Sequence, residues 1–467
     1  MRYRFKTKPY RHQIVALKRL LRQRHLGLLW EPGTGKTKAI IDAACALHLS
    51  GGLQRVLVVC PLSVVGVWEE EFEKHAPISY TLNILSRTDT PDDWTTWDNH
   101  FSIMIANYDL VWRRPQIVER FQPQMVVADE SHRIKKPSAR RSRYMRRFKD
   151  VPYRAILTGT PTPKSFIDLY SQWVFLNAKQ FGTNFSAFKR RYVIFGGYLN
   201  KQVKGYTNVP ELKAKIKEDA YVRRKDQCLD LPDQTFQRVP VVLEPEAMQA
   251  YMKMEYELFL ELKNGEVSDA KNIAVKVMRL QQITGGWITS DEGNLHMISQ
   301  AKLRACQERL EDLWDDDERV VCFARFRAEV QAVADFGIRS RIPTYVLSGA
   351  VRREERDAAR RRFQTEVGPS LFVAQIQTGG LGITLHSSAE VIFYSVTYAL
   401  DDYIQACDRV HRIGQTRNVR YQHLVVPSSV DADIYANLQG KKNMMAEIMG
   451  DPQKFAKHLQ GRIEKRV

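Results

Sequence analysis

A glycine-rich stretch near the N-terminus has the residue types that cradle phosphate groups. It lies between an apolar run that ends at Trp30 and a segment whose apolar residues have helical spacing. Glycines let backbone N–H groups converge on phosphate oxygens, and the start of a helix favours negative charge. We therefore predict a nucleotide phosphate site in which Lys36 reaches the outer phosphates and Thr37 binds Mg²⁺; its residues are Gly33, Thr34, Gly35, Lys36 and Thr37. A glycine-rich turn before an ordinary helix is the alternative, because Trp30 stands where the strict motif has glycine.

Two adjacent acids could supply the chemistry of phosphate cleavage. Asp129 and Glu130 follow four apolar residues that have the composition of a buried strand. In open α/β sheets ligands bind at the C-terminal ends of the strands, so the two acids are expected beside the phosphate cradle. There Asp129 can bind Mg²⁺, and Glu130 can orient and deprotonate an attacking water molecule. A solvated acidic pair at a strand exit is the alternative.

Three further side chains are candidates for contacts with a nucleotide. Arg409 and Arg412 are spaced i, i+3, which predicts that both project from one face of a helix. Two guanidinium groups aimed at the nucleotide of another lobe would stabilise charge on a transferring phosphoryl group. The amide of Gln13 can pair with both a donor and an acceptor on an adenine edge. Solvated arginines and a surface glutamine are the alternatives.

Buried strands must position these residues, and both halves of the sequence contain them. Strand-like runs alternate with helical patterns in each half, which predicts an α/β fold with two doubly wound parallel-sheet lobes and helical insertions. The runs fall at residues 26–30, 55–60, 103–106, 125–128 and 154–157 in the first half, and at 319–323, 343–347, 370–374, 391–394 and 420–425 in the second.

We expect one lobe in residues 1–230 and another in residues 231–467, with a linker at Leu231-Pro232-Asp233. A helical segment at about 246–284 should precede the strands of the second lobe.

In residues 163–230 aromatic and basic residues interleave, which predicts a helical insertion with a basic face. Nucleic-acid contact and plain solvation fit that face equally well. After residue 163 no Asn-Gly or Asp-Gly turn joins two alternating strands, so no hairpin is predicted there.

Composition narrows the class of partner. The chain carries 71 Lys and Arg against 53 Asp and Glu, a net charge of +18 that attracts polyanions such as nucleic acids. A merely soluble basic surface is the alternative.

No apolar run reaches the ~18 residues of a membrane span, and the N-terminus lacks the apolar core of a signal peptide. Cys60 and Cys322 lie in apolar runs, so we expect reduced core thiols in a cytoplasmic protein.

Six motifs in this order resemble those of the Swi/Snf-type ATPases of helicase superfamily two. The resemblance covers nearly the whole chain, and the blocks Asp-Glu-x-His-Arg-Ile-Lys and Asp-Arg-x-His-Arg-Ile-Gly-Gln are its most specific parts. The motifs are Gln13, Gly33–Thr37, Asp129–Lys136, Leu157–Pro161, Gly379–Ile383 and Gln405–Gln415. The family commonly has Ser-Thr-Arg-Ala where this chain has Gln375–Thr378, which puts a usual hydroxyl contact with DNA in doubt.

The resemblance implies ATP and Mg²⁺ as ligands and two recombinase-like lobes with the active site at their interface. It places Gln13 on adenine and Gln405 at the nucleotide, Asp129 on Mg²⁺, and Glu130 in the role of the base. It also implies that Arg409 and Arg412 are arginine fingers. The residues expected to couple hydrolysis to motion are Thr158, Thr160, Gly380 and Gly382.

The implied function is an ATP-dependent DNA translocase or remodeller that acts on double-stranded or forked DNA by DNA-stimulated ATP hydrolysis. A strand-separating helicase is one alternative, and an ATP-switched nucleic-acid clamp with little turnover is another. Glu130 and the two arginines argue against the clamp, because all three serve turnover. No chromatin-reading or zinc module is visible, so the sequence is typical of a bare motor in a bacterial or host-cell cytoplasm.

Overall fold

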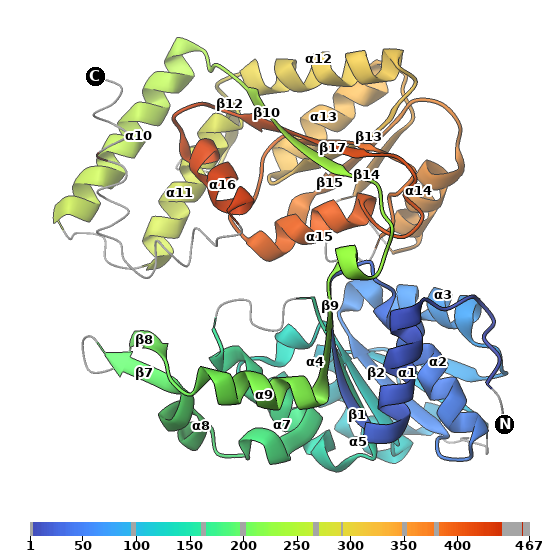
Figure 1. Ribbon diagram of the computed structural model, residues 1–467. Coiled ribbons are helices and arrows are strands. Elements are labelled where there is room, and N and C mark those ends of the chain that lie inside the picture. The colour runs from blue at the N-terminus through green and yellow to red at the C-terminus, as the bar shows by residue number, and fades with distance from the viewer. Residues whose placement is uncertain are drawn as a thin grey trace. The chain divides into compact units, whose positions relative to one another are not determined.

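The continuous apolar runs of the sequence form the buried strands of two separate parallel sheets (Figure 1). The structure, a computed structural model, describes residues 3–94, 100–159, 165–196, 202–264, 270–290, 293–347, 353–377, 383–440 and 460. The chain divides into two compact units, Met1–Asp230 and Leu231–Val467, and each contains one of the two sheets. Helices cover both faces of each sheet, which confirms the predicted α/β class with two doubly wound lobes.

In unit 1 the sheet has seven strands in the order β3-β4-β2-β5-β6-β1-β9, and all neighbours are parallel. The five predicted strands occupy the middle of this sheet. The two edge strands, β3 and β9, were not predicted. The strands are β1 (His25–Trp30), β2 (Arg55–Cys60), β3 (Thr81–Ile84), β4 (Ser102–Asn107), β5 (Met125–Asp129), β6 (Tyr153–Leu157) and β9 (Ala220–Arg223).

The two faces of this sheet are covered by different helices because successive side chains of a strand point to opposite sides. On one face Leu28 and Val58 pack with α1, α2 and α3. On the other face Leu57 and Ile156 pack with α4, α5, α6 and α7. The helices of unit 1 are α1 (Arg11–Gln23), α2 (Lys36–Leu49), α3 (Val65–His75), α4 (Tyr108–Arg113), α5 (Pro115–Phe121), α6 (Arg140–Met145), α7 (Ile167–Phe181), α8 (Phe185–Tyr192) and α9 (Val209–Asp219).

The segment 163–230 differs from its prediction. Besides α7, α8 and α9 it contains an antiparallel hairpin of β7 (Val193–Gly196) and β8 (Gln202–Tyr206), with a bulge at Ile194/Phe195, and the sheet strand β9. The prediction of a helical insertion therefore holds for α7, α8 and α9, but the absence of a predicted hairpin was wrong. The strands of the hairpin are separated by residues 197–201, so the two-residue turn signature of the shortest hairpins was the wrong signal to seek.

In unit 2 the sheet has six parallel strands in the order β10-β17-β16-β13-β15-β14. Five of them match the five predicted runs, and the sixth, β10, was not predicted. The strands are β10 (Gln234–Pro240), β13 (Arg319–Ala324), β14 (Thr344–Leu347), β15 (Ser370–Gln375), β16 (Glu390–Phe393) and β17 (Val419–Val425), and a small antiparallel pair is formed by β11 (Trp287–Thr289) and β12 (Leu295–Met297).

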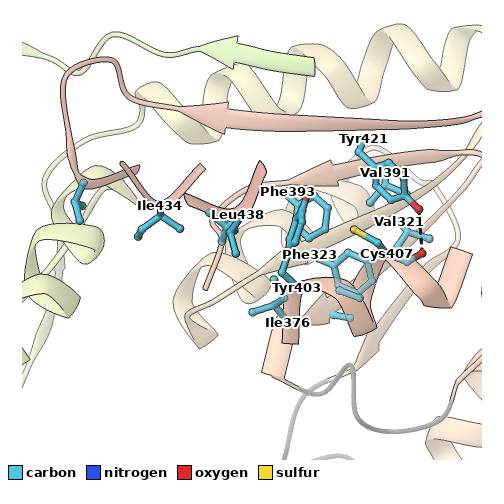
Figure 2. Packing of buried hydrophobic residues seen from close by; sticks show 14 of the residues in the cluster. Val321, Phe323, Ile376, Val391, Phe393, Tyr403, Cys407, Tyr421, Ile434 and Leu438 are labelled. Atoms are coloured by element: carbon cyan, nitrogen blue, oxygen red, sulfur yellow. Dashed lines mark hydrogen bonds between the residues drawn. The ribbon is translucent and has the colours of Figure 1, made fainter. Parts of the chain in front are cut away.

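Helices again cover both faces of the unit 2 sheet. Phe323 and Phe393 pack on one face with α10, α11, α14, α15 and α16, as Figure 2 shows for part of this core. Cys322 packs on the other face with α12 and α13. The predicted segment 246–284 forms two helices. The helices are α10 (Pro245–Asn264), α11 (Ala270–Thr284), α12 (Ala301–Asp315), α13 (Arg327–Arg339), α14 (Arg353–Thr365), α15 (Leu400–Val410) and α16 (Val430–Gln439).

Two smaller predictions concern cysteines and membranes. Cys60 in β2 and Cys322 in β13 are fully buried free thiols, as predicted for core residues. Among the described residues, no helix combines the length and the apolar character that crossing a bilayer requires.

Candidate active site

Three neighbouring strands bring the predicted phosphate-binding and acidic residues to one edge of the unit 1 sheet. β6 lies between β1 and β5, and Leu157 is in register with both Leu28 and Asp129. Because the strands are parallel, their C-terminal ends lie at the same edge of the sheet. The segments that follow β1, β6 and β5 therefore leave the sheet next to one another, and these segments carry the glycine-rich loop, Thr158 and the acid pair.

The loop between β1 and α2 has the backbone of an anion cradle. Gly33 and Gly35 have φ angles of 79° and 78°, in the left-handed region that favours glycine, and Gly35 is the residue before the first turn of α2. The N–H groups of that first turn have no partner within the helix and can face a phosphate. Lys36 crosses the loop, and its Nζ donates to the carbonyl oxygens of Trp30 at 2.8 Å and Glu31 at 3.3 Å. Its ammonium group therefore lies across the loop, and its contact with the outer phosphates of a nucleotide stays a prediction.

The segment after β6 touches this loop directly. A Cβ atom on Gly159 would lie 2.8 Å from Cδ of Pro32, closer than side-chain carbons pack, so only glycine fits there without displacing the loop. Thr158 is completely buried, and its N–H donates to the carbonyl of Leu28 at 3.2 Å. Gly159 and Thr158 thus join the segment after β6 to the glycine-rich loop and to β1. Of the other expected coupling residues, Thr160, Gly380 and Gly382 lie outside the described residues.

The Asp129 carboxylate is held rigidly at the end of β5. Trp68 Nε1 donates to one oxygen at 2.9 Å, and the backbone N–H of Glu130 donates to the other at 2.9 Å. Burial raises the pKa of Asp129 to about 6 and the Glu130 charge adds to this, whereas the Trp68 hydrogen bond and the Lys36 charge oppose the rise. When ionised, this fixed carboxylate has the oxygen ligands that a divalent cation prefers.

Glu130 lies in a sharp turn that follows Asp129. Its φ of 49° and ψ of 53° are in the left-handed region, which costs a non-glycine residue about 1 kcal/mol or more and persists where the surroundings enforce it. Its carboxylate lies 3.3 Å from Nδ1 of His132, and the next residue, Ser131, donates to Oε1 of Gln172 in α7 at 2.7 Å. The Ser131–Gln172 hydrogen bond thus anchors the turn that carries the acid pair to α7.

The structure places Gln13 against the phosphate loop. Its Oε1 accepts the backbone N–H of Tyr10 at 2.8 Å, and its Nε2 donates to the carbonyl of Gly35 at 3.0 Å. Next to it, His12 Nε2 lies 2.9 Å from the carbonyl of Thr34, and burial lowers the His12 pKa. Both side chains support the loop through its backbone. His12 was not predicted, because nothing in its local sequence distinguishes it from an ordinary helix residue.

In unit 2 the predicted nucleotide-facing residues lie on and just after α15. Tyr403 and Cys407 face the core, as Figure 2 shows, whereas Gln405 and Arg409 are half-buried and lie one turn apart on the helix. Arg412 is not on this helix, because α15 ends at Val410. The prediction that Arg409 and Arg412 share one helix face was therefore wrong.

The physical reason lies at the end of α15. Nε2 of His411 lies 2.8 Å from the carbonyl oxygen of Pro232, and Gly414 has a φ of 102° that no helix allows. His411 itself has φ −87° and ψ 83°, so the chain leaves the helical conformation before it reaches Arg412. Arg412 consequently sits in the turn, where its Nη1 lies 3.4 Å from the carbonyl oxygen of Ile383.

The SNF2-related domain matches residues 10–285, which is more than half of the chain. The chain belongs to the SNF2-related family. The helicase conserved C-terminal domain matches residues 301–414, within unit 2.

Similar proteins include the Chromodomain-helicase-DNA-binding protein 1-like of Mus musculus, 27% identical over 89% of this chain and 47% of the relative. The ATP-dependent helicase fft1 of Schizosaccharomyces pombe is 23% identical over 93% of this chain and 52% of the relative. The solved SWI2/SNF2 ATPase core of Sulfolobus solfataricus in complex with double-stranded DNA has a TM-score of 0.44, with 25% identity over 96% of this chain and 94% of that chain. This SNF2-related chain spans between 21% and 61% of the length of the curated relatives that it matches.

A pocket of arginines lies at the same sheet edge of this SNF2-related chain. It has a volume of about 160 Å³ and is formed by segments that follow β2, β3, β4 and β5. Tyr108, which also lines the pocket, donates its hydroxyl to the carbonyl of Asp129 at 2.7 Å, so the pocket adjoins the acid pair. We call this site the arginine pocket; its cations are Arg87, Arg113, Arg133 and Arg141. Such a set of guanidinium groups is suited to binding phosphates.

Two functional features of the site were missed by reasoning from the sequence alone. Trp68 was not predicted as a site residue, because its hydrogen bond to Asp129 depends on how α3 packs on the sheet. The arginine pocket collects residues that are 54 positions apart in the sequence, from Arg87 to Arg141. The sequence signal that could have found it is the position of Arg133, three residues after Glu130.

Proposed function

We propose that this chain is an ATP-dependent DNA translocase or remodeller. The observation that carries the proposal is the placement of a phosphate loop, an acid pair and an arginine pocket at one edge of a single sheet. Family membership supports it, as do relatives whose names describe an ATP-dependent helicase and a DNA-binding helicase. The cytoplasm of a bacterium or of a host cell is the compartment that we propose for it.

The unit 1 site fits ATP and Mg²⁺. The left-handed glycines and the N–H groups in the first turn of α2 would hold the phosphates, and Lys36 would neutralise the outer ones. Thr37, in the first turn of α2, and Asp129 would hold the cation, which withdraws negative charge from the phosphates when bound. Glu130 would take a proton from the attacking water. Gln13 Nε2 donates a hydrogen bond to the carbonyl oxygen of Gly35, so this side chain would bind adenine only after that hydrogen bond breaks.

The proposed coupling between hydrolysis and motion runs through the contact of Gly159 with Pro32. A change at the phosphate loop would displace Pro32 and with it Thr158, which is buried in the sheet edge. From unit 2, Arg409 and Arg412 would stabilise charge on the phosphoryl group, and Gln405 would contact the nucleotide.

DNA is the proposed partner, in double-stranded or forked form. The arginine pocket offers four guanidinium groups at the sheet edge, and a net charge of +18 attracts a phosphate backbone. Stacking between Trp112 and two arginines, Arg113 at 5.2 Å and Arg140 at 5.4 Å, orders the cations around this pocket.

Replacing Glu130 by glutamine separates ATP binding from chemistry. Glutamine keeps the size and most hydrogen bonds of the side chain but cannot accept a proton. ATP should bind with its usual affinity, while kcat for DNA-stimulated hydrolysis should fall by at least about 10²-fold. Glu73→Gln, on the exposed side of α3, is the matched control and should behave like the unmodified chain. A parallel loss of ATP affinity in Glu130→Gln would assign this carboxylate to ground-state binding instead.

The choice between translocase and helicase is tested with two DNA substrates. ATP hydrolysis should displace a third strand from a DNA triplex, while a plain partial duplex should stay largely paired, and native gels can follow both. Robust unwinding of a forked duplex without third-strand displacement would reject the translocase. In that case the β7–β8 hairpin is the candidate wedge, and replacing its exposed Ile194 and Val203 by serine should abolish unwinding. ATP binding with negligible turnover on every DNA would instead support the clamp.

A further inference from the structure

A second cationic region lies on the flank of unit 1, away from the active-site edge. Residues 133–149 contain nine Lys and Arg and no Asp or Glu. This segment follows β5 and runs through α6 into the 3-10 turn Arg146–Asp150, whose last residue is the first acid after it; β6 begins at Tyr153. Because β5 and β6 are parallel, its beginning lies at the active-site edge and its end at the opposite edge. Arg133 and Arg141 belong to the arginine pocket, and the cations that follow do not.

The later cations line a groove of about 360 Å³, here called the flank groove. None of its lining residues is acidic. One wall is cationic and the other is apolar, with the aromatic rings contributed by α7 and α8. The residues that matter to the argument are Arg143, Arg146, Arg147, Lys149, Tyr170 and Phe185.

Among the residues that the structure describes, Arg147 alone of the four groove cations is paired with an acid. Arg147 lies 3.1 Å from Glu119 in an exposed pair, which contributes little, and Arg146 donates to the carbonyl of Pro137 at 3.1 Å. Lys189 adds a further cation 4.9 Å above the ring of Phe185. Like charges held this close repel one another, so a polyanion that binds among them gains favourable electrostatic energy.

The apolar wall narrows the class of polyanion. Tyr170 is almost fully buried and packs against Phe185 with ring centroids 4.9 Å apart, so the half-buried Phe185 ring is the aromatic surface of the groove. A base would stack on this ring in place of the Lys189 ammonium group. A duplex presents phosphates on its outside and has no base free to meet such a ring. A single strand presents both phosphates and unstacked bases, and a cationic groove with an aromatic ring is how single strands are bound.

We propose that the flank groove is an accessory site for a single-stranded nucleic acid, with phosphates on Arg143 and Lys149 and a base against Phe185. The proposal rests on the proposed DNA motor, because a motor on forked DNA has a free strand to bind. The arginine pocket and the flank groove share no lining residue, so duplex and single strand can be bound at the same time.

Three variants test the proposal. Arg143→Gln with Lys149→Gln removes two exposed cations, and Phe185→Leu removes the aromatic ring but keeps an apolar side chain. Lys18→Gln with Arg22→Gln is the matched control: it removes the same charge from exposed positions of α1, on the opposite face of the sheet. DNA-stimulated ATPase with a short duplex should be unchanged in all three.

The measurement is the binding of fluorescent oligothymidylate and oligouridylate, about 10 nucleotides long, to chain saturated with short unlabelled duplex. The double cation variant should bind more weakly, and its slope of log K against log salt should be shallower by about 0.7 for each phosphate that is no longer neutralised. Phe185→Leu should weaken binding by at least about fivefold, and the charge control should bind normally. The oligonucleotide that binds more tightly identifies the strand as DNA or RNA.

Three results would overturn the proposal: displacement of the oligonucleotide by saturating duplex, equal losses of affinity in the α1 control, or normal oligonucleotide binding by both groove variants. Inorganic polyphosphate provides a further check, because it has charge without bases. Its binding should weaken in the double cation variant and not in Phe185→Leu, and an equal loss in both would overturn the base contact. Absence of duplex-stimulated ATPase in the unmodified chain would refute the proposed function, a result that none of these binding outcomes can mimic.

Discussion

Replacing Lys36 by alanine is expected to weaken ATP binding and to reduce DNA-stimulated turnover to about a thousandth or less. The Nζ atom crosses the phosphate loop and carries the cation that would neutralise the outer phosphates. Its charge also lowers the pKa of Asp129, so the two side chains already interact across the site. Fluorescent nucleotide binding and a coupled ATPase assay measure the two effects separately.

The fold should survive this change. The Lys36 side chain is half-buried and donates to loop carbonyls, so the cost in stability should be about 1 kcal/mol. Lys74→Ala, at an exposed position of α3, controls for the loss of a positive charge from unit 1. Near-normal hydrolysis by a Lys36→Ala chain with an unchanged melting temperature would rule out the proposed phosphate loop.

Replacing Arg412 by alanine should slow turnover by roughly 10³-fold while leaving ATP affinity nearly unchanged. An arginine finger stabilises charge that develops only as the phosphoryl group is transferred, so its loss appears in kcat. Single-turnover hydrolysis at saturating ATP and DNA measures this step directly.

Arg417→Ala is the matched control for Arg412. Arg417 lies five residues further on and forms an exposed bidentate pair with Glu318 at 2.6 Å and 2.8 Å, so its loss should change stability by less than about 1 kcal/mol and leave turnover intact. Should Arg412→Ala reduce ATP affinity and kcat by the same factor, Arg412 would be a ground-state contact and not a finger.

The central strands were predictable because they are buried on both faces and consist of continuous apolar residues. β2 and β13 are examples, since each has five fully buried residues in a row. The acid pair was predictable for a related reason: polar residues directly after such a run must emerge at the C-terminal edge of the sheet. Burial thus leaves a local signal that does not require knowledge of the partners.

Edge strands leave no such signal. β10 reads Gln-Thr-Phe-Gln-Arg-Val-Pro and is exposed along most of its length, so its sequence looks like a linker. It becomes a strand only because β17, far along the chain, offers a free edge. The position at which α15 ends could not be predicted from local sequence either, because the contact of His411 with Pro232 joins segments that are distant in the sequence. Tertiary contacts of this kind override local periodicity.

Each sheet is completed by a strand pairing between the beginning and the end of its unit, which has a consequence for synthesis on the ribosome. Gly27 of β1 is in register with Ala220 of β9, and Gln234 of β10 is in register with Val419 of β17. In each unit the first strand is made early and its last partner emerges nearly two hundred residues later, so the closing step has a high contact order and is expected to be slow. Unit 1 can close while unit 2 is still being translated. β10 stays unpaired until β17 has been synthesised. Its polar, solvent-tolerant sequence is expected to limit aggregation of this unpaired strand with other nascent chains.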